Sequence, residues 1–458
     1  MLLLHFFTPK IAHSSYILAG SQTCAVIDPR RDVQVYIDAA KSLGMKITHV
    51  LETHLHADFI SGHLDLAEKT GATIYAPKSA GCAFDHVALS EGDEIAFEDI
   101  VLQVLETPGH TPEHISYVAI DTSRGAEPVG VFCGDTLFVG DVGRPDLFPG
   151  KAEELAKSLF SSLHDKLLKL PDFCEVLPAH GAGSLCGRAM GAKWRSTIGY
   201  ERLYNSALQI RERNEFVKSL TTGMPPAPDH FSRCSAVNGK GPALVSSLPA
   251  PKELNPLQFA EESAREKTVV LDIRPYAAFG GQHIAGSYHI DYGGNFPTFA
   301  GWVIPQDKNI LLVVPEAVQV SEVLDWLRRV GMDRVSGVLA GSLHAWAAAG
   351  LSAEHLRQLS ATKLHEMLRD REDLALVDVR APGEYETEHI SKATNIPVAD
   401  LRTRHTEIDS SSPVALICST GHRSSLGASI LLQNGFEKVY NVAGGMTGYL
   451  AAGLATEL

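Results

Sequence analysis

The apolar positions of the N-terminal part alternate between the spacing of strands and the spacing of helices. Residues 14–28 and 47–51 are apolar runs of strand length, and a turn at Ser21-Gln22 divides the first run in two. Between them we expect a helix that Asp32 caps and Gly44 ends. Its buried face would comprise Val33, Ile37, Ala40 and Leu43. Strands and helices in this order predict an α/β fold, an αββα sandwich with its site at the strand ends.

A second helical pattern is followed by a stretch that is rich in proline. The expected helix ends by Pro171, and its apolar stripe recurs every four residues, at Leu155, Leu159, Leu163 and Leu167. Prolines from Pro225 to Pro256 interrupt any regular element, which predicts an extended linker.

The C-terminal part contains one pattern twice. Val270–Arg274 and Leu376–Arg380 both run from an apolar strand into Asp-x-Arg, and His283-Ile284 matches His389-Ile390 at the same offset. Two copies of one α/β fold are therefore expected, each long enough for its own core. The predicted organisation is residues 1–222, a linker at 223–256, a first copy at 257–353 and a second copy at 354–458.

The composition is that of a globular protein without a basic surface. Hydrophobic residues make up 45% and charged residues 21% of the chain. The formal net charge of −14 argues against a nucleic-acid partner. No apolar run reaches the roughly 18 residues of a membrane span, and the apolar start lacks a signal peptide's basic residues. Seven scattered cysteines, an odd number, predict the reducing cytoplasm.

Histidines and carboxylates follow the predicted strands of the first segment. Directly after the strand at 47–51 come His54, His56 and Asp58. Later apolar runs lead to loops, marked by glycine or proline, that carry His110, Asp135 and His180. Imidazoles and carboxylates gathered at strand ends are suited to bind a first-row transition metal.

This order of motifs resembles the metallo-β-lactamase fold, whose pattern runs H-x-H-x-D-H and then H, D and H. The family's two-metal hydrolases have a histidine where this chain has Phe59, and a phenyl ring has no lone pair. The second metal position would keep only Asp58 and His180 as ready ligands. The motif is similar to that of the persulfide dioxygenases, which implies one Fe(II) per chain. Its ligands would be His54, His110 and Asp135, a facial triad with open positions opposite.

Further groups are expected around this metal. By the same resemblance, His56, Asp58 and His180 would orient ligands or substrate. Arg144 lies in a Gly-Arg-x-Asp turn like that of the persulfide dioxygenases and would shape the substrate entrance, or else pin its loop by a salt bridge. Cys186 would take part in sulfur transfer or contact the substrate, unless it is a buried structural cysteine. A zinc site with other ligands remains an alternative.

One cysteine of the second copy lies between a strand and a helix. The run Leu416-Ile417 leads into Cys418, and a helix with Leu426 and Ile430 follows. Backbone N–H groups and a helix N-terminus stabilise a thiolate there, and Arg423 adds a positive charge. By resemblance to the active loop of the rhodanese fold, the cradle for a cysteine persulfide would comprise Ser419, Thr420, Gly421, His422 and Ser424.

The repeat resembles the rhodanese fold, in which Asp-x-Arg after a strand precedes His-Ile. Cys418 to Arg423 has the C-x₄-R spacing of rhodanese sulfurtransferases, whereas related phosphatases have C-x₅-R. In the first copy Val314 stands opposite Cys418. We expect that copy to be catalytically inactive and to act as a spacer or an assembly surface.

The order of parts is similar to the persulfide dioxygenase–rhodanese fusions of bacterial sulfide detoxification. This resemblance implies that a low-molecular-weight thiol persulfide, O₂ and water give sulfite and free thiol at the iron. Sulfane sulfur carried as a Cys418 persulfide would then pass to sulfite and leave as thiosulfate. The resemblance also implies a homo-oligomer, and neither nucleic acid nor membrane is an expected partner.

Two other functions remain open. A zinc thioester hydrolase of the glyoxalase II kind, fused to a sulfurtransferase, needs two metal ions and a bridging hydroxide, and Phe59 argues against it. A non-enzymatic persulfide carrier or sensor would store sulfur on Cys418 without chemistry in the first segment. The thiol itself, glutathione, coenzyme A or another, is left open.

Overall fold

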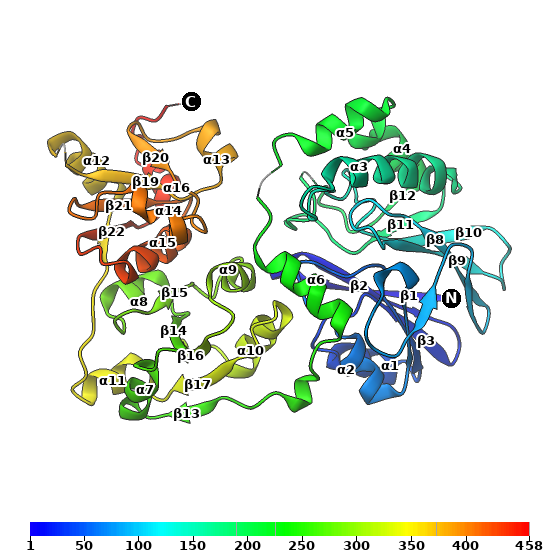
Figure 1. Ribbon diagram of the computed structural model, residues 1–458, viewed down its shortest axis with the longest axis horizontal. Coiled ribbons are helices and arrows are strands. Elements are labelled where there is room, and N and C mark those ends of the chain that lie inside the picture. The colour runs from blue at the N-terminus through cyan, green and yellow to red at the C-terminus, as the bar shows by residue number, and fades with distance from the viewer. Residues whose placement is uncertain (189, 225, 372, 458) are drawn as a thin grey trace. The chain divides into compact units, whose positions relative to one another are not determined.

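The computed structural model describes residues 1–188, 190–224, 226–371 and 373–457. They form two compact units, one of Met1–Leu248 with Arg328–Gly331 and one of Pro249–Leu327 with Met332–Leu458. Figure 1 labels the helices and strands of both units. Among the described residues, no helix has the length and apolar character that crossing a membrane requires.

Two six-stranded sheets lie at the centre of the first unit. The first comprises β1 (Leu2–Thr8), β2 (His13–Ala19), β3 (Thr23–Ile27), β4 (Lys46–Leu51), β5 (Thr73–Pro77) and β6 (Val87–Leu89), side by side in chain order. The second comprises β7 (Glu94–Phe97), β8 (Ile100–Glu106), β9 (Ile115–Asp121), β10 (Pro128–Gly134), β11 (Glu175–Pro178) and β12 (Ser196–Thr197), also adjacent in that order. β3 to β6 are parallel, as are β10 and β11, so their carboxyl ends point to a common edge.

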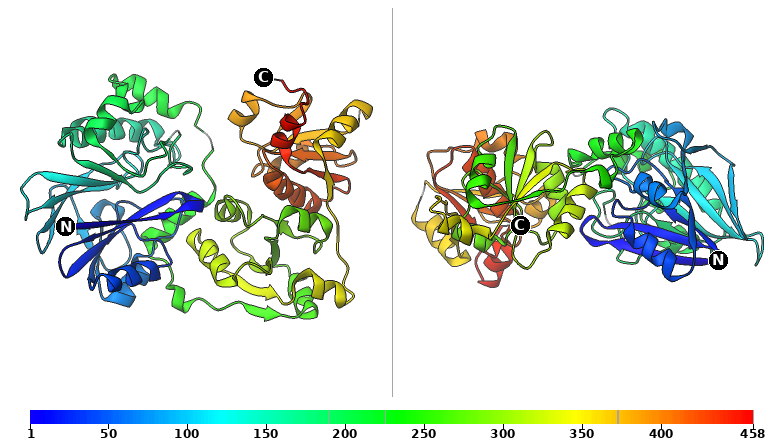
Figure 2. Two further views of the ribbon diagram at one scale, coloured as in Figure 1. Left: turned by 180° about the vertical axis from the view of Figure 1, so that it is seen from behind. Right: turned by 90° about the horizontal axis from the view of Figure 1, so that it is seen from below.

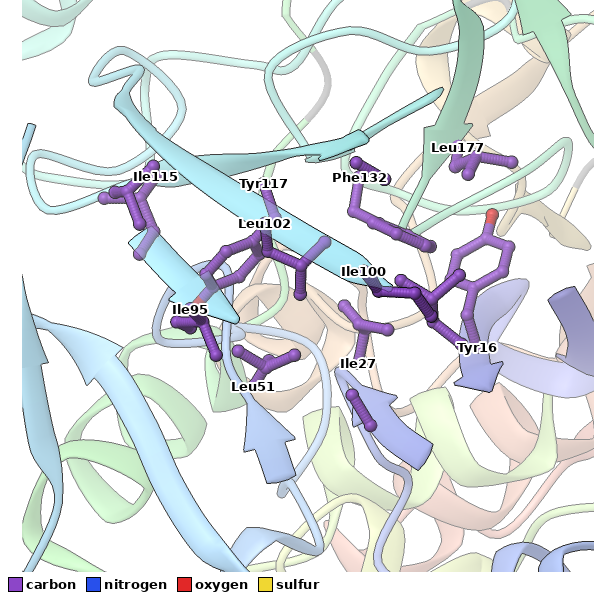
Figure 3. Packing of buried hydrophobic residues seen from close by; sticks show 14 of the residues in the cluster. Tyr16, Ile27, Leu51, Ile95, Ile100, Leu102, Ile115, Tyr117, Phe132 and Leu177 are labelled. Carbon is purple, nitrogen blue, oxygen red and sulfur yellow. The ribbon is translucent and has the colours of Figure 1, made fainter. Parts of the chain in front are cut away.

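Helices cover the outer faces of the two sheets: α1 (Gln34–Ser42), α2 (His63–Thr70), α3 (Ala152–Ser161), α4 (Ile198–Tyr204) and α5 (Arg213–Thr221). A further helix, α6 (His230–Lys240), packs on the loop after β4. Tyr16 and Leu18 of β2 join the core between the sheets, whereas Ile17 and Ala19, on the other face, pack with residues of α1. Figure 3 shows the core between the sheets, with Ile27 and Leu51 opposite Leu102, Ile115 and Phe132. The predicted αββα sandwich is confirmed.

Two helices of the first unit differ in detail from the prediction. α1 begins at Gln34 with Val33 at its N-cap, so Asp32 does not cap it and instead pairs with Arg30 at 2.9 Å. The leucine stripe is buried along its whole length, but α3 ends at Ser161. A π-helical turn and a 3₁₀ turn then carry Leu163 and Leu167. Apolar residues at every fourth position predict a buried face, but they do not predict whether the backbone hydrogen bonds are those of an α, π or 3₁₀ helix.

The stretch expected to be an extended linker contains a helix, so that prediction was wrong. The prolines cluster at its two ends and leave residues 229–241 free of proline, where α6 forms. Asn238 of α6 donates from its side-chain amide to the backbone oxygens of His56 and Phe59, at 2.9 and 2.8 Å. It also accepts from the backbone N–H of Ser61 at 2.9 Å. This helix therefore fixes the backbone of the histidine-rich loop.

The second unit contains two five-stranded parallel sheets with the same strand order. The first copy has β13 (Lys252–Leu254), β14 (Thr268–Asp272), β15 (Tyr288–His289), β16 (Asn309–Val313) and β17 (Val335–Leu339), ordered 13-17-16-14-15. The second has β18 (Arg357–Leu359), β19 (Ala375–Asp378), β20 (Ala393–Asn395), β21 (Val414–Ile417) and β22 (Val439–Val442), ordered 18-22-21-19-20. In Figure 2 the first copy is green to yellow and the second orange to red.

Each copy has its own helices. They are α7 (Pro256–Ser263), α8 (Tyr276–Gly281), α9 (Phe296–Val303), α10 (Val320–Arg329) and α11 (Ser342–Ala348) in the first copy. The second has α12 (Ala361–Asp370), α13 (Pro382–Thr387), α14 (Leu401–Arg404), α15 (His422–Gln433) and α16 (Gly445–Ala451).

The duplication extends to single hydrogen bonds. Asp272 accepts from the Arg274 guanidinium Nε at 2.9 Å, and Asp378 accepts from Arg380 Nε at the same distance. Each of these buried arginines also donates to a backbone carbonyl eight residues further on, at 2.8 Å in the first copy and 2.7 Å in the second. The Asp-x-Arg motif is thus a structural brace in both copies.

Candidate metal centre and sulfur-transfer loop

Three side chains from three loops meet at the edge of the first unit's sheets. His54 follows β4, His110 follows β8 and Asp135 follows β10, and each is at most 1% exposed. His110 Nε2 lies 3.4 Å and His54 Nε2 lies 3.9 Å from Asp135 Oδ2. None of these three atoms has a hydrogen-bond partner. Because buried polar atoms are costly to leave unpaired, their convergence fits a bound metal ion.

Hydrogen bonds behind the ligands fix which atom faces the metal position. Thr53 donates its hydroxyl to Asp28 Oδ2 at 2.9 Å, so its oxygen accepts from His54 Nδ1 at 2.9 Å. His110 Nδ1 lies 2.8 Å from the backbone oxygen of Arg144, which can only accept. Both imidazoles therefore carry the proton on Nδ1 and present the Nε2 lone pair to the metal.

Asp28 is a site residue that sequence reasoning missed. Asp28 directly follows β3 and has a positive φ of 50°, which is uncommon for residues other than glycine. Its Oδ1 accepts from the backbone N–H of Thr53 at 2.7 Å, in addition to the hydroxyl contact. A polar residue at the end of a buried strand was the signal available in the sequence.

His56 is not among the three converging ligands and lies with two carboxylates instead. Its Nε2 lies 3.1 Å from Asp28 Oδ1 and 3.8 Å from Glu52 Oε2. Burial and the neighbouring Asp28 carboxylate raise the pKa of Glu52 well above its usual range. Asp28, Glu52 and His56 thus form a further buried group of converging polar atoms, and the orienting role of His56 stays a prediction.

A second group lies on the other side of Asp135. It consists of Asp58, His180 and Cys186, all buried. His180 Nδ1 donates to Asp135 Oδ1 at 2.7 Å, and its Nε2 lies 2.9 Å from Asp58 Oδ2. Burial alone would lower the pKa of His180, but the Asp135 and Asp58 carboxylates raise it well above the ordinary value. This histidine therefore bridges two carboxylates.

Cys186 corrects the expectation that Asp58 and His180 are the only groups left at the second position. Its thiol joins them within metal-binding distance. Burial, followed by the Asp58 and Asp135 carboxylates, raises the pKa of Cys186 well above that of a free thiol. Cys186 is far from Asp58 in the sequence, so the sequence alone did not predict this contact.

The phenyl ring of Phe59 packs against two histidines and has no lone pair with which to bind a metal. It is fully buried, with its centroid 4.1 Å from that of His13 and 4.4 Å from that of His56. Neither ring nitrogen of the buried His13 has a hydrogen-bond partner. His13 was not singled out from the sequence, where nothing marks it beyond its place in an apolar strand.

Arg144 forms the salt bridge that was the alternative to a role at the entrance. Its Nε and Nη2 donate to Asp146 at 2.6 and 2.8 Å, and its Nη1 donates to the Leu185 carbonyl at 3.2 Å. The side chain is 1% exposed. Arg144 therefore joins its own loop to the loop of Cys186, while its backbone oxygen orients His110.

In the second copy, Cys418 directly follows β21 and is almost fully buried. The backbone N–H of Gly421 lies 3.1 Å from its sulfur, and the Ser424 hydroxyl lies 3.3 Å away. Gly421 has φ +100°, which lets the loop turn into α15. Two donors of the predicted cradle thus contact the sulfur directly.

The guanidinium of Arg423 is paired with a carboxylate, and its positive charge still interacts with the Cys418 sulfur. Its Nη1 and Nη2 donate to the two Glu384 oxygens at 2.6 and 2.7 Å, and Nη2 also donates to Ser419 Oγ at 2.7 Å. Hydrogen bonds from Arg423 lower the pKa of Glu384 to about 2. Thr420 is exposed, and His422 Nδ1 lies 3.1 Å from Asp291 Oδ2. These groups surround the loop without touching the sulfur.

The first copy lacks this loop. β16 pairs Val313 with Asp272 as β21 pairs Ile417 with Asp378, so Val314 occupies the place of Cys418. A valine there offers no nucleophile.

Comparisons with known proteins agree with this organisation. The sequence matches the metallo-beta-lactamase superfamily over residues 9–173 and the rhodanese-like domain over residues 255–349 and 360–452. The chain belongs to the metallo-beta-lactamase superfamily and carries two rhodanese-like domains after that fold.

Similar proteins include two kinds of enzyme. The mitochondrial persulfide dioxygenase ETHE1 of Mus musculus is 32% identical over 239 residues, which are 50% of this chain and 85% of that protein. A hydroxyacylglutathione hydrolase of Rhizobium johnstonii is 31% identical over 249 residues, 53% of this chain and 88% of that protein. A crystal structure titled metallo-beta-lactamase, from Staphylococcus aureus subsp. aureus COL, is 34% identical with a TM-score of 0.67. It covers 74% of this chain and 99% of its own.

Proposed function

We propose that this chain is a bifunctional sulfur-detoxification enzyme of the cytoplasm. Its first unit would oxidise a low-molecular-weight thiol persulfide with O₂, and its second rhodanese-like domain would transfer sulfane sulfur to sulfite. The observation that carries the first activity is the convergence of three unpaired ligand atoms, on His54, His110 and Asp135. Similarity to the ETHE1 persulfide dioxygenases supports it.

Two histidines and one carboxylate are the donor set of mononuclear non-haem iron oxygenases, so we assign one Fe(II) per chain. When bound, iron supplies the redox chemistry that activates dioxygen and holds the substrate sulfur beside it. The overall reaction consumes RSSH, O₂ and H₂O and yields RSH, SO₃²⁻ and two protons.

The chain's own residues would prepare this reaction. Asp28 and Thr53 hold the tautomer of His54, and the Arg144 carbonyl holds that of His110. Asp58 and His180 fix the Asp135 carboxylate through the ion pair they share. Cys186 belongs to the second group, and its thiol would contact the substrate persulfide.

At Cys418 the thiolate would attack the outer sulfur of a second persulfide. A sulfur–sulfur bond to Cys418 forms, the donor's own sulfur–sulfur bond breaks, and the thiol departs with the proton. Sulfite then attacks the outer sulfur of the Cys418 persulfide and leaves as thiosulfate, which restores the thiolate. The Gly421 N–H and the Ser424 hydroxyl would stabilise the negative sulfur at each stage.

A covalent connection between the two activities would raise the effective concentration of sulfite at Cys418. All seven cysteines are free, and a reducing compartment is part of the proposal. Self-association into a homo-oligomer, suggested by the family resemblance, belongs to the same proposal.

Oxygen uptake with glutathione persulfide and coenzyme A persulfide tests this function. The wild type should consume O₂ and release thiosulfate. Cys418→Ser should consume O₂ at the same rate but release sulfite, whereas His110→Ala should consume none and keep sulfur transfer. His344→Ala, at an exposed position on α11, is the matched control. Absence of O₂ uptake with every persulfide would contradict the proposal.

A thioester hydrolase is a second candidate, because the structure adds Cys186 to Asp58 and His180. Such an enzyme holds two metal ions about 3.5–4 Å apart with an activated water between them. Similarity to hydroxyacylglutathione hydrolases points the same way. Release of D-lactate from S-lactoylglutathione, without oxygen uptake on persulfides, would favour this candidate over the dioxygenase.

A further inference from the structure

The second unit has a cavity of about 500 Å³ beside the sulfur-transfer loop. Thr420, His422 and Arg423 of the active copy form one wall. The opposite wall comes from the inactive copy, in the segment 290–299, which runs from the end of β15 into the first turn of α9 and includes Asp291, Phe296 and Phe299. The cavity is within the usual size of small-molecule pockets, about 300–1,000 Å³.

Hydrogen bonds between the two copies hold this second wall in place. The backbone N–H of His289 at the end of β15 donates to Ser429 Oγ of α15 at 3.0 Å. Arg402 of α14 donates to the Trp302 carbonyl of α9 at 2.7 Å. The segment 290–299 lies between these two points, so its position over the loop is fixed at both ends.

The basic side chains in the cavity wall already have carboxylate partners. His422 Nδ1 of the active copy lies 3.1 Å from Asp291 Oδ2 of the inactive copy, and Arg423 pairs with Glu384 within the active copy. Asp291 is itself anchored, since it accepts from the backbone N–H of Gly293 and of Tyr276 at 3.0 and 3.2 Å. A small inorganic dianion therefore finds no unmatched cation in these walls and depends on the N–H groups of the loop.

An organic ligand has more to gain from the same walls. Phe299, which is partly exposed, supplies aromatic surface in the wall, with the buried Phe296 behind it, and Asp291 can accept from an ammonium or amide N–H. The cavity is also far larger than an inorganic sulfur anion needs. These features suit a molecule with a carbon body and polar N–H groups whose sulfur reaches the loop.

We propose that this cavity binds the carbon body of an organic thiol persulfide, so that the inactive copy selects the sulfur donor of the active copy. This inference rests on the proposed sulfur transfer at Cys418 and adds the residues that recognise the organic part of the sulfur donor. In the transfer, Cys418–S⁻ and RSSH give Cys418–S–S⁻ and RSH, with no change in the number of electrons.

Donor kinetics of the full chain test the inference, in the His110→Ala background so that no persulfide is oxidised. Cyanide serves as acceptor and thiocyanate is measured, with glutathione persulfide as one donor and thiosulfate as the other. Phe299→Ala should raise KM for glutathione persulfide about tenfold, the effect of losing apolar contact in a binding pocket. KM for thiosulfate should change less than twofold. Phe173→Ala, at an exposed site in the first unit, is the control.

A second variant covers the case in which Phe299→Ala does not fold. Phe299→Leu keeps apolar volume and should give a smaller rise in KM for glutathione persulfide alone. Equal changes for both donors, or no change for either, would overturn the inference. Loss of transfer is a separate result: if Cys418→Ser still produces thiocyanate, the proposed sulfur transfer itself fails, whatever the Phe299 variants do.

Discussion

Two groups of potential ligands lie on either side of Asp135, and they differ in the hydrogen bonds of their members. In the first group, His54 and His110 are each engaged at Nδ1, which leaves Nε2 for a metal. In the second group, both nitrogens of His180 face carboxylates, and burial holds the Cys186 thiol protonated by raising its pKa. The residue types do not show which group binds a metal. The hydrogen-bond partners of each side chain do, because they decide which nitrogen or sulfur atom has a free lone pair.

Phe59 strengthens the difference. Its buried ring stands beside Asp58 in the chain and packs on His13 and His56. The first group therefore has three donors ready for one ion, whereas the second would need His180 and Cys186 to lose protons first.

The largest effect is expected from the first group. His110→Ala removes one of three ligands and should lower metal affinity and O₂ uptake by more than about a hundredfold, beyond the loss typical of outer partners. Bound iron and oxygen consumption measure this. Cys418-dependent sulfur transfer should be unchanged, and its loss would mean that the variant is misfolded rather than metal-free.

A smaller effect should follow from a residue that touches no metal. Asp28→Asn keeps the shape but weakens acceptance from Thr53, so His54 is less firmly oriented. We expect metal affinity to fall by roughly 10- to 100-fold. Competition with a chelator measures the affinity; an affinity equal to that of the wild type would show that the hydrogen bonds behind His54 do not matter.

A substitution that adds an imidazole to the second group should allow that group to bind a metal ion as well. Phe59→His should raise the metal content from one towards two ions per chain, because it restores a donor beside Asp58. Phe59→Leu removes the ring without adding a nitrogen, and its metal content should stay at one ion per chain. Elemental analysis measures the metal content of the two variants. Equal metal content in both would show that Phe59 does not determine how many ions the chain binds.

The smallest effect is expected from Cys186→Ala. If the second group holds no ion, metal content should stay at one per chain and O₂ uptake at saturating persulfide should change less than about threefold, near 0.6 kcal/mol. Loss of a metal ion on this substitution would instead make Cys186 a ligand.

The sequence was most informative where chemistry follows local pattern. Strand ends placed His54, His110 and Asp135, and the repeated Asp-x-Arg motif predicted two copies of one fold. Contacts between distant segments were not visible in any spacing. Asp28 reaches Thr53, Cys186 approaches Asp58, and Asp291 of one copy pairs with His422 of the other. Helix α6 was missed because the prolines at both ends of residues 223–256 suggested an irregular linker, although its middle lacks proline.

The metal content of the anaerobically purified chain tests the central claim most directly. Elemental analysis should find one iron per chain, lost in His110→Ala and kept in Cys186→Ala. Two ions per chain in the wild-type protein, with zinc in place of iron, would contradict a mononuclear dioxygenase and favour the hydrolase.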